Sequence, residues 1–214
     1  TSAKNLSAQE VSSIDIEDTL CEAFIALGCS DIHFRLFSPI LSWIKEHGSA
    51  VIIEKLVKIL RRRAAAGRDV SCATLFGRFA LSQGHKRWST VVGSFAPVDA
   101  VERIIGPADL AESLLSLRGE EEWARGSGFR IPQGAPETDP KWTLSRKGLA
   151  SINRQYRNRL IYGALWRADI VTAYELGART PAEASRLSGA SYEPCYRVKE
   201  ELEAASIVFL MPHQ

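Results

Sequence analysis

The sequence lacks the motifs and the long apolar runs that mark the common classes of enzyme and membrane protein. It has no G-x-x-x-x-G-K-[ST] or G-x-G-x-x-G loop for nucleotides, no H-E-x-x-H zinc helix and no G-x-S-x-G nucleophile turn. No apolar run approaches the ~20 residues that span a bilayer, and the N-terminus has no basic segment followed by an apolar one. We therefore expect no catalytic centre, no membrane contact and a cytoplasmic location.

Cysteine and histidine are also scarce, with four of each in 214 residues. The cysteines stand at 21, 29, 72 and 195, with no C-x-x-C pair and no histidine at metal-ligand spacing from them. A disulfide framework needs a denser pattern, and reduced thiols fit a cytosolic protein. We expect small buried cysteines, no metal site and no cofactor. The acidic residues Asp15, Glu17, Asp18 and Glu22 are expected on the solvent side of an amphipathic helix.

What the chain does contain is a series of helical patterns. Apolar residues recur at helical spacing in 14–27, from Ser38-Pro39 to 47, in 52–60 and in 71–82, and further patterns cover 97–105 and 107–117. Residues 88–95 are ambiguous between a short strand and a loop. Glycines and prolines crowd residues 126–140, which predicts a linker. The predicted fold is mainly α with minimal β structure: a helical domain at 14–125, a linker at 126–142 and a second domain at 143–214.

The clearest local signals lie in the second domain. Thr180 and Glu183 have the spacing of a capping box, Pro181 suits the first helical position, and Gly189 can supply a positive φ in a turn. These signals predict a helix at 167–176, a short helix at 180–187, a turn, and a third helix from Ser191 to about 205. A short strand is expected at 207–210.

Three segments of this second domain resemble those of a known protein family. The segment TPAEASRLSGAS at 180–191 resembles the short helix and turn of bacterial winged helix-turn-helix transcriptional regulators. The segment VKEELEAASIV at 198–208 resembles the end of their recognition helix running into the wing, and LIYGALWRADI at 160–170 resembles what precedes these elements. The resemblance covers only this C-terminal part of the chain. It implies a winged-helix-type fold, binding of double-stranded DNA, and a role as a transcriptional regulator or accessory factor.

Charge is distributed unevenly along the chain. Residues 141–168 hold seven basic side chains and no acidic one, whereas 99–122 hold seven acidic and two basic ones. Basic residues interleaved with aromatics suit a surface that contacts phosphates, but they could equally pair with the acidic stretch of this chain or of a partner subunit. A second basic cluster at 55–68 is explained more simply by a solvated helix end than by a DNA contact.

The DNA-binding hypothesis assigns roles to eight residues. General phosphate attraction would come from Arg154, Arg157, Arg159 and Arg167. Base or backbone contacts would come from the first half of the third helix, through Ser191, Tyr192, Tyr196 and Arg197. The helical domain at 14–125 would supply a homodimer or partner interface, and a dimer would contact two half-sites about one helical turn apart.

The third helix also favours an alternative. Residues 193–203 hold four acidic and two basic side chains, a balance that is unfavourable next to phosphate. Only four residues follow Leu210, so we expect the wing to be absent, truncated or formed differently. The alternative is a protein-protein interaction module in which the winged helix is a docking scaffold, since a fold does not by itself determine a function.

Overall fold

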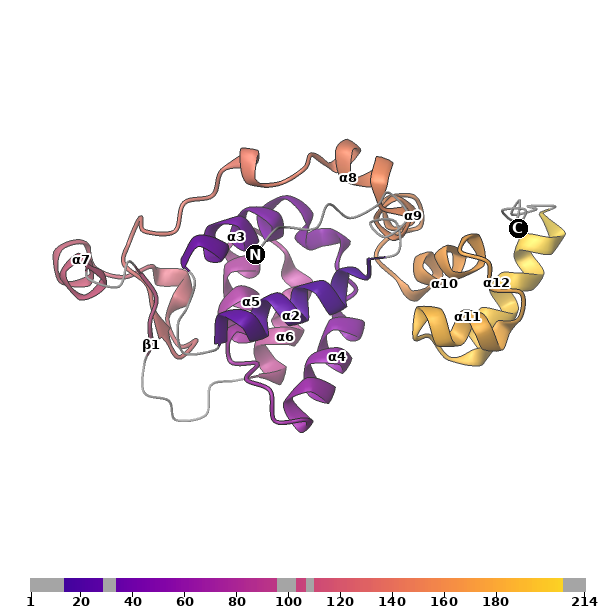
Figure 1. The fold of residues 1–214 in the computed structure, drawn as a ribbon, viewed down its shortest axis with the longest axis horizontal. Coiled ribbons are helices and arrows are strands. Elements are labelled where there is room, and N and C mark those ends of the chain that lie inside the picture. The colour runs from indigo at the N-terminus through magenta and orange to yellow at the C-terminus, as the bar shows by residue number, and fades with distance from the viewer. Residues whose placement is uncertain (1–13, 29–33, 96–102, 107–109, 206–214) are drawn as a thin grey trace, which may run out of the picture. The chain divides into compact units, whose positions relative to one another are not determined.

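The computed structural model describes residues 14–28, 34–95, 103–106 and 110–205 (Figure 1). These residues divide into two compact units. One unit, called the terminal unit, combines residues up to 16 with those from 147 onward, and the central unit spans 17–146. Helices dominate the described residues, and the two strands have two residues each, so the expectation of a mainly α fold is confirmed. None of the described helices is long and apolar enough to cross a lipid bilayer.

The central unit contains most of the helices. They are α2 (Ile16–Gly28, whose first residue belongs to the terminal unit), α3 (Phe34–His47), α4 (Ile53–Ala65), α5 (Cys72–Ser82), α6 (Ser89–Ser94) and α7 (Ala111–Arg118). Short 3-10 turns lie at η1 (Gly48–Ala50), η2 (Lys86–Trp88), η3 (Glu122–Ala124) and η4 (Pro140–Trp142). The strands are β1 (Arg103–Ile104) and β2 (Phe129–Arg130).

The core of the central unit forms where the apolar faces of α2, α3 and α5 meet. The ring of Phe76 stacks on that of Phe24 with 4.7 Å between centroids. The ring of Phe37 packs against that of Phe76 with 5.4 Å between centroids. Phe37, Leu41 and Ile44 share one buried face of α3. Burial of Phe37 extends this helix upstream of the predicted start at Ser38, so that Pro39 lies inside α3 and not at its first position.

Two segments of the central unit differ from their predicted structure. Residues 89–94 form α6, a short helix, where the sequence left a strand and a loop as alternatives. The helix predicted for 97–105 is wrong at Arg103 and Ile104, which form β1 and pair in parallel with Phe129 and Arg130. The amides of Arg103 and Ile105 donate to the carbonyl oxygens of residues 128 and 130, a long-range pairing without a local signal. Residues 96–102 lie outside the described part of the chain.

The N-terminal carboxylates and the basic cluster at 55–68 neutralise each other in part. Glu17 is fully buried, contrary to the expected solvent position, because it accepts a hydrogen bond from the Ile52 amide at 2.8 Å and lies 3.6 Å from the Lys55 ammonium. At the surface, Arg63 pairs with Glu22 at 2.7 Å. The cluster therefore contributes less free positive charge than the sequence indicates.

Residues 126–142, which were assigned to a linker, belong to the central unit. The end of this segment and the residues that follow it are anchored to α3: the Asp139 amide donates to Ser42 Oγ at 3.0 Å, and His47 Nε2 lies 2.9 Å from the Leu144 carbonyl oxygen. Because that nitrogen bonds a carbonyl oxygen, it carries the proton and donates. The division between the units falls at Arg146 and Lys147, and the glycines and prolines mark turns within an anchored segment.

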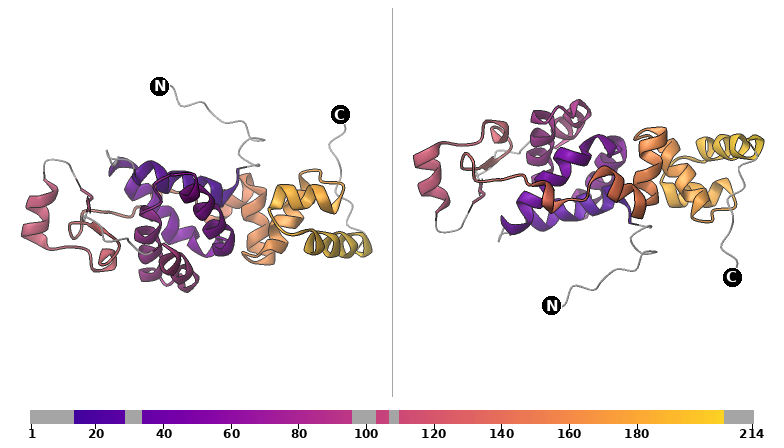
Figure 2. Two further views of the ribbon diagram at one scale, coloured as in Figure 1. Left: turned by 90° about the horizontal axis from the view of Figure 1, so that it is seen from below. Right: turned by 90° about the horizontal axis from the view of Figure 1, so that it is seen from above.

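The terminal unit is helical in its described part. Its helices are α8 (Arg146–Ile152, whose first residue belongs to the central unit), α9 (Arg154–Tyr162), α10 (Trp166–Glu175), α11 (Pro181–Ser188) and α12 (Tyr192–Ala204). Helices α10, α11 and α12 form a compact group, visible from two sides in Figure 2. They enclose a small core of Ile170, Val171, Ala173, Tyr174, Ala184, Ala190, Cys195, Val198 and Leu202. The strand predicted for 207–210 lies outside the described residues.

Three cysteines are buried and free, as expected: Cys21, Cys72 and Cys195. Position 29 lies outside the described residues. Burial raises the pKa of Cys21 to about 11 and also raises the pKa of Cys195. The reactive species is the thiolate, and a pKa near 11 leaves about one thiol in a thousand ionised at pH 8.

We therefore expect these three cysteines to resist iodoacetamide at pH 8 in the native protein and to react readily in urea. Peptide mapping by mass spectrometry would follow each site. Rapid native labelling of Cys21 would contradict its burial, and labelling of the urea-unfolded chain is the control for reagent activity.

Candidate functional site

The start of α11 is set by a complete capping box. The Thr180 hydroxyl accepts from the Glu183 amide at 3.2 Å, and the Glu183 carboxylate accepts from the amides of Arg179 at 2.7 Å and Thr180 at 3.3 Å. These two backbone hydrogen bonds, that of Arg179 first, lower the pKa of Glu183. Gly189 ends the helix in the left-handed region with φ 75°. The predicted helix, cap and turn are confirmed here.

The turn between α11 and α12 is held by buried hydroxyl groups. Ser188 Oγ donates to the Ala184 carbonyl oxygen at 2.7 Å and accepts from the Ala190 amide at 3.2 Å. Tyr174 Oη, from α10, donates to the carbonyl oxygen of Cys195 at 2.8 Å, and burial raises the pKa of Tyr174 to about 12. The path of α12 relative to α10 and α11 is therefore fixed by hydrogen bonds as well as by apolar packing.

The structure brings four of the predicted residues together on the first two turns of α12. Ser191, Tyr192, Tyr196 and Arg197 are all exposed. The two tyrosine rings stack with 6.5 Å between centroids, and a hydrogen bond between Tyr196 and Glu200 raises the pKa of Tyr196. Arg197 forms an ion pair with Glu193 one turn earlier. The opposite face of α12 is buried through Cys195, Val198 and Leu202.

Arg159 is not on the surface, and its assignment to phosphate attraction is corrected. Its side chain is 0% exposed, and it donates from Nε to Asp169 Oδ1 and from Nη2 to Asp169 Oδ2, both at 2.9 Å. Burial of this arginine is possible because the bidentate carboxylate neutralises its charge and accepts from two of its donors. A phosphate cannot reach the guanidinium without disrupting the packing of α9 on α10.

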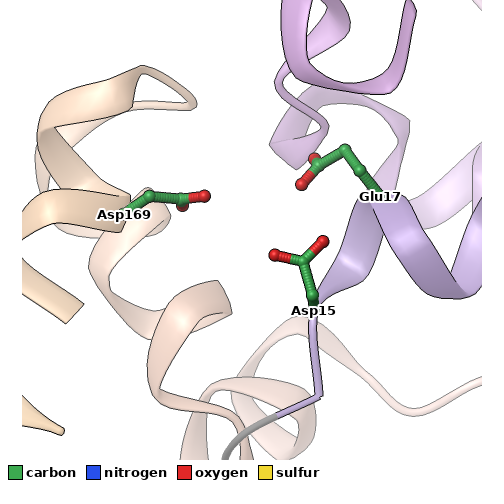
Figure 3. Close-up of side chains that lie close together, drawn as sticks. All are labelled: Asp15, Glu17 and Asp169. Carbon is green, nitrogen blue, oxygen red and sulfur yellow. The ribbon is translucent and has the colours of Figure 1, made fainter. Parts of the chain in front are cut away.

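The Asp169 carboxylate is the centre of a wider network in the terminal unit. Gln155 Nε2 donates to Asp169 at 2.9 Å and to Asp15 at 3.0 Å, and Gln155 Oε1 accepts from the Ile16 amide at 3.0 Å. Figure 3 shows the carboxylates of Asp15 and Asp169 pointing toward each other. Since Arg159 neutralises Asp169 and the Gln155 amide bridges the two carboxylates, we assign these residues to holding Asp15 and Ile16 against α9 and α10.

The other three predicted arginines are exposed, and each is engaged within the terminal unit. Arg154 Nη1 donates to the Glu175 carbonyl oxygen at 3.1 Å, Arg157 pairs with the Glu175 carboxylate at 2.9 Å, and Arg167 pairs with Glu201 on α12. Their partners in the described part of the chain are therefore in the terminal unit, and not in the acidic stretch 99–122. The idea that this stretch neutralises them has no support among these contacts.

Two further basic residues at this face were missed by the sequence analysis. Arg179 precedes the capping box and Arg186 lies on α11, and both are exposed. Within the described residues neither has an ion-pair partner. The signal that could have found them is their place beside the capping box, because a first helix and the loop before it can approach the phosphates that flank a groove.

No protein-family model, curated protein or solved structure matches this chain. The chemistry of α12 and of the arginines around it is thus the basis for assigning a function.

Proposed function

We propose that the terminal unit binds double-stranded DNA as a helix-turn-helix, with α11 as the first helix and α12 as the recognition helix. One observation carries the proposal: α12 is anchored along one face by the core and exposes Ser191, Tyr192, Tyr196 and Arg197 on its first two turns. A helix fixed on one side and polar at its exposed N-terminal half is what readout of a major groove requires.

Phosphate contacts in this proposal come from two sets of side chains. Arg179 and Arg186 are exposed and have no ion-pair partner among the described residues, so their charge is directly accessible. Arg154, Arg157 and Arg167 would exchange their present acceptors for phosphate. Exposed ion pairs contribute only about 0–1 kcal/mol each to stability, so this exchange costs little free energy.

The first turn of α12 supports the proposal in a second way. Ser191 is its N-cap residue, yet the hydroxyl of Ser191 makes no capping hydrogen bond. That hydroxyl and the amides of Tyr192 and Glu193 would then be free to donate to a phosphate. Tyr192 and Tyr196 would lie deeper in the groove, where an aromatic ring can contact a thymine methyl group and a phenol can bond a base edge.

We further propose that this DNA binding serves transcription regulation, directly or as an accessory factor. The central unit would then supply a homodimer or partner contact. In a two-fold dimer, the two copies of α12 would contact half-sites about one helical turn apart.

A second candidate function is favoured by the charge of α12. The helix holds four glutamates against Arg197 and Lys199, and each of these two cations is already paired with a glutamate, Arg197 with Glu193 and Lys199 with Glu203. A face of this kind could dock on a basic protein surface. In that case α12 would bind protein and the arginines would have only a structural role.

Fluorescence anisotropy of labelled random-sequence duplex DNA, titrated with the full chain at several salt concentrations, separates the two candidates. We expect micromolar binding whose log affinity falls with log salt at a slope steeper than about −3.5, as expected for four or more neutralised phosphates. The paired substitution Arg154→Ala/Arg157→Ala should flatten this slope, and Tyr192→Ala/Tyr196→Ala should weaken binding with little effect on it. Arg87→Ala, an exposed arginine of the central unit paired with Glu54, is the matched control. Absence of binding at low salt would reject DNA and favour the docking module.

A further inference from the structure

Arg78, on α5 of the central unit, is a partly buried arginine without an acceptor. Among the described residues no carboxylate, carbonyl or hydroxyl group receives a hydrogen bond from it, and its buried Nε has no partner. Most buried polar groups in proteins are satisfied, and a guanidinium costs more than a neutral group when it is not. Its neighbour in the chain, Phe79, is fixed by an edge-to-face contact with Trp123 at 5.1 Å, so α5 and η3 hold the surroundings of Arg78 in place.

The guanidinium lies directly over a tight turn that follows η3. The Ser127 amide donates to the Ala124 carbonyl oxygen at 3.1 Å, and Gly126 occupies the left-handed region with φ 67°. A Cβ atom at position 126 would lie 3.0 Å from Nη2 and 3.5 Å from Cζ of Arg78. The positive φ therefore favours glycine at this position, and a side chain there would displace the end of Arg78. The exposed Gly126 amide has no acceptor among the described residues.

The charged groups next to this turn are Arg78, Arg125 and Arg130 against Glu120, Glu121 and Glu122, so the local charge is balanced, but the carboxylates are shared unevenly. Arg125, next to Gly126, lies 3.7 Å from Glu120, and the same carboxylate also pairs with Arg130 at 3.1 Å. One carboxylate thus serves two arginines while Arg78 has none. The neighbouring Glu121 accepts from the Gly134 amide at 2.8 Å. A fork of guanidinium donors beside a free backbone amide matches the several oxygens of a phosphate group better than the two coplanar oxygens of a carboxylate.

We propose that Arg78 and the turn at Gly126 form a binding site for a small phosphorylated ligand. Arg78 Nη2 would donate to the phosphate, the Gly126 amide would donate to a second oxygen, and Arg125 would add positive charge at the rim. This site is in the central unit and goes beyond the proposed DNA-binding function, which rests on α11 and α12.

The test uses inorganic phosphate as the probe for the full chain. In ¹H–¹⁵N spectra, the Gly126 amide resonance is expected to shift and saturate at millimolar phosphate, and not with sodium chloride at the same ionic strength. Arg78→Gln should weaken this binding at least tenfold, whereas Arg87→Gln, an exposed arginine of the same unit, should leave it unchanged. If Arg78→Gln fails to fold, the wild-type titration still decides, because a Gly126 resonance that does not move overturns the proposal.

A parallel titration with duplex DNA identifies the source of the phosphate. We expect Arg78→Gln to bind duplex with wild-type affinity, since the proposed DNA contacts are elsewhere. An equal loss of affinity for duplex and for inorganic phosphate would overturn the assignment to a small ligand. Failure of duplex binding by the wild type would leave the phosphate result standing, so the two proposals can fail separately.

Discussion

Replacing Asp169 with alanine is expected to lower the free energy of unfolding of the terminal unit by about 3–5 kcal/mol. The side chains of Arg159 and Asp169 are 0% and 1% exposed, and two hydrogen bonds of 2.9 Å join them. Alanine removes the carboxylate that neutralises the buried guanidinium, and it also removes an acceptor of Gln155. Hydrogen exchange of peptides from residues 154–204, measured by mass spectrometry, would report the loss in this unit alone.

An exposed ion pair in the same unit provides the matched control. Arg167 and Glu201 are 48% and 52% exposed, and Arg167→Ala should cost less than about 1 kcal/mol. The double substitution Arg159→Met/Asp169→Leu should be less damaging than Asp169→Ala, because it removes both charges together. Equal destabilisation by Asp169→Ala and Arg167→Ala would show that the buried pair does not stabilise the unit.

Only part of the candidate site could be predicted from the sequence. The segments that form α11 and the following turn are predictable because their signals are local: Thr180, Pro181, Glu183 and Gly189 act through neighbours three or four residues away. The exposure of Tyr192, Tyr196 and Arg197 follows from the helical period of the core residues on the other face of α12.

The burial of Arg159 could not be predicted in this way. Its partner Asp169 is ten residues away on the next helix, so no helical spacing links the two side chains. A count of charges over 141–168 ends one residue before Asp169, and the segment therefore looks purely basic. Of the four arginines assigned to phosphate, the three that remain at the surface are already engaged with Glu175 or Glu201.

The features of the central unit that the sequence did not predict also depend on contacts between elements that are distant in the sequence. The parallel pairing of Arg103 with Phe129 joins segments 26 residues apart, and helical periodicity carries no information about it. The burial of Glu17 depends on Lys55 and on the amide of Ile52, which belong to other elements. By contrast, α4 and α5 were predicted because their apolar faces are continuous and face a single core.

Trp88→Ala is expected to be the most damaging substitution in the central unit, with a loss of about 3–5 kcal/mol in its free energy of unfolding. Trp88 is 1% exposed, in η2 just before the α6 helix that the sequence did not reveal. Its indole Nε1 donates to the carbonyl oxygen of Gly48 at 3.0 Å. Alanine therefore leaves both a large cavity and a carbonyl oxygen without its donor.

Trp88→Phe separates these two contributions. The phenyl ring fills much of the space but cannot donate, so a loss of only about 1–3 kcal/mol is expected from the orphaned carbonyl. Hydrogen exchange of peptides from α4 and α5 would measure both variants in the central unit. Equal losses would mean that the hydrogen bond, and not the packed volume, makes Trp88 essential. Neither variant should change the affinity for duplex DNA at a temperature where it remains folded, because every proposed DNA contact comes from the terminal unit.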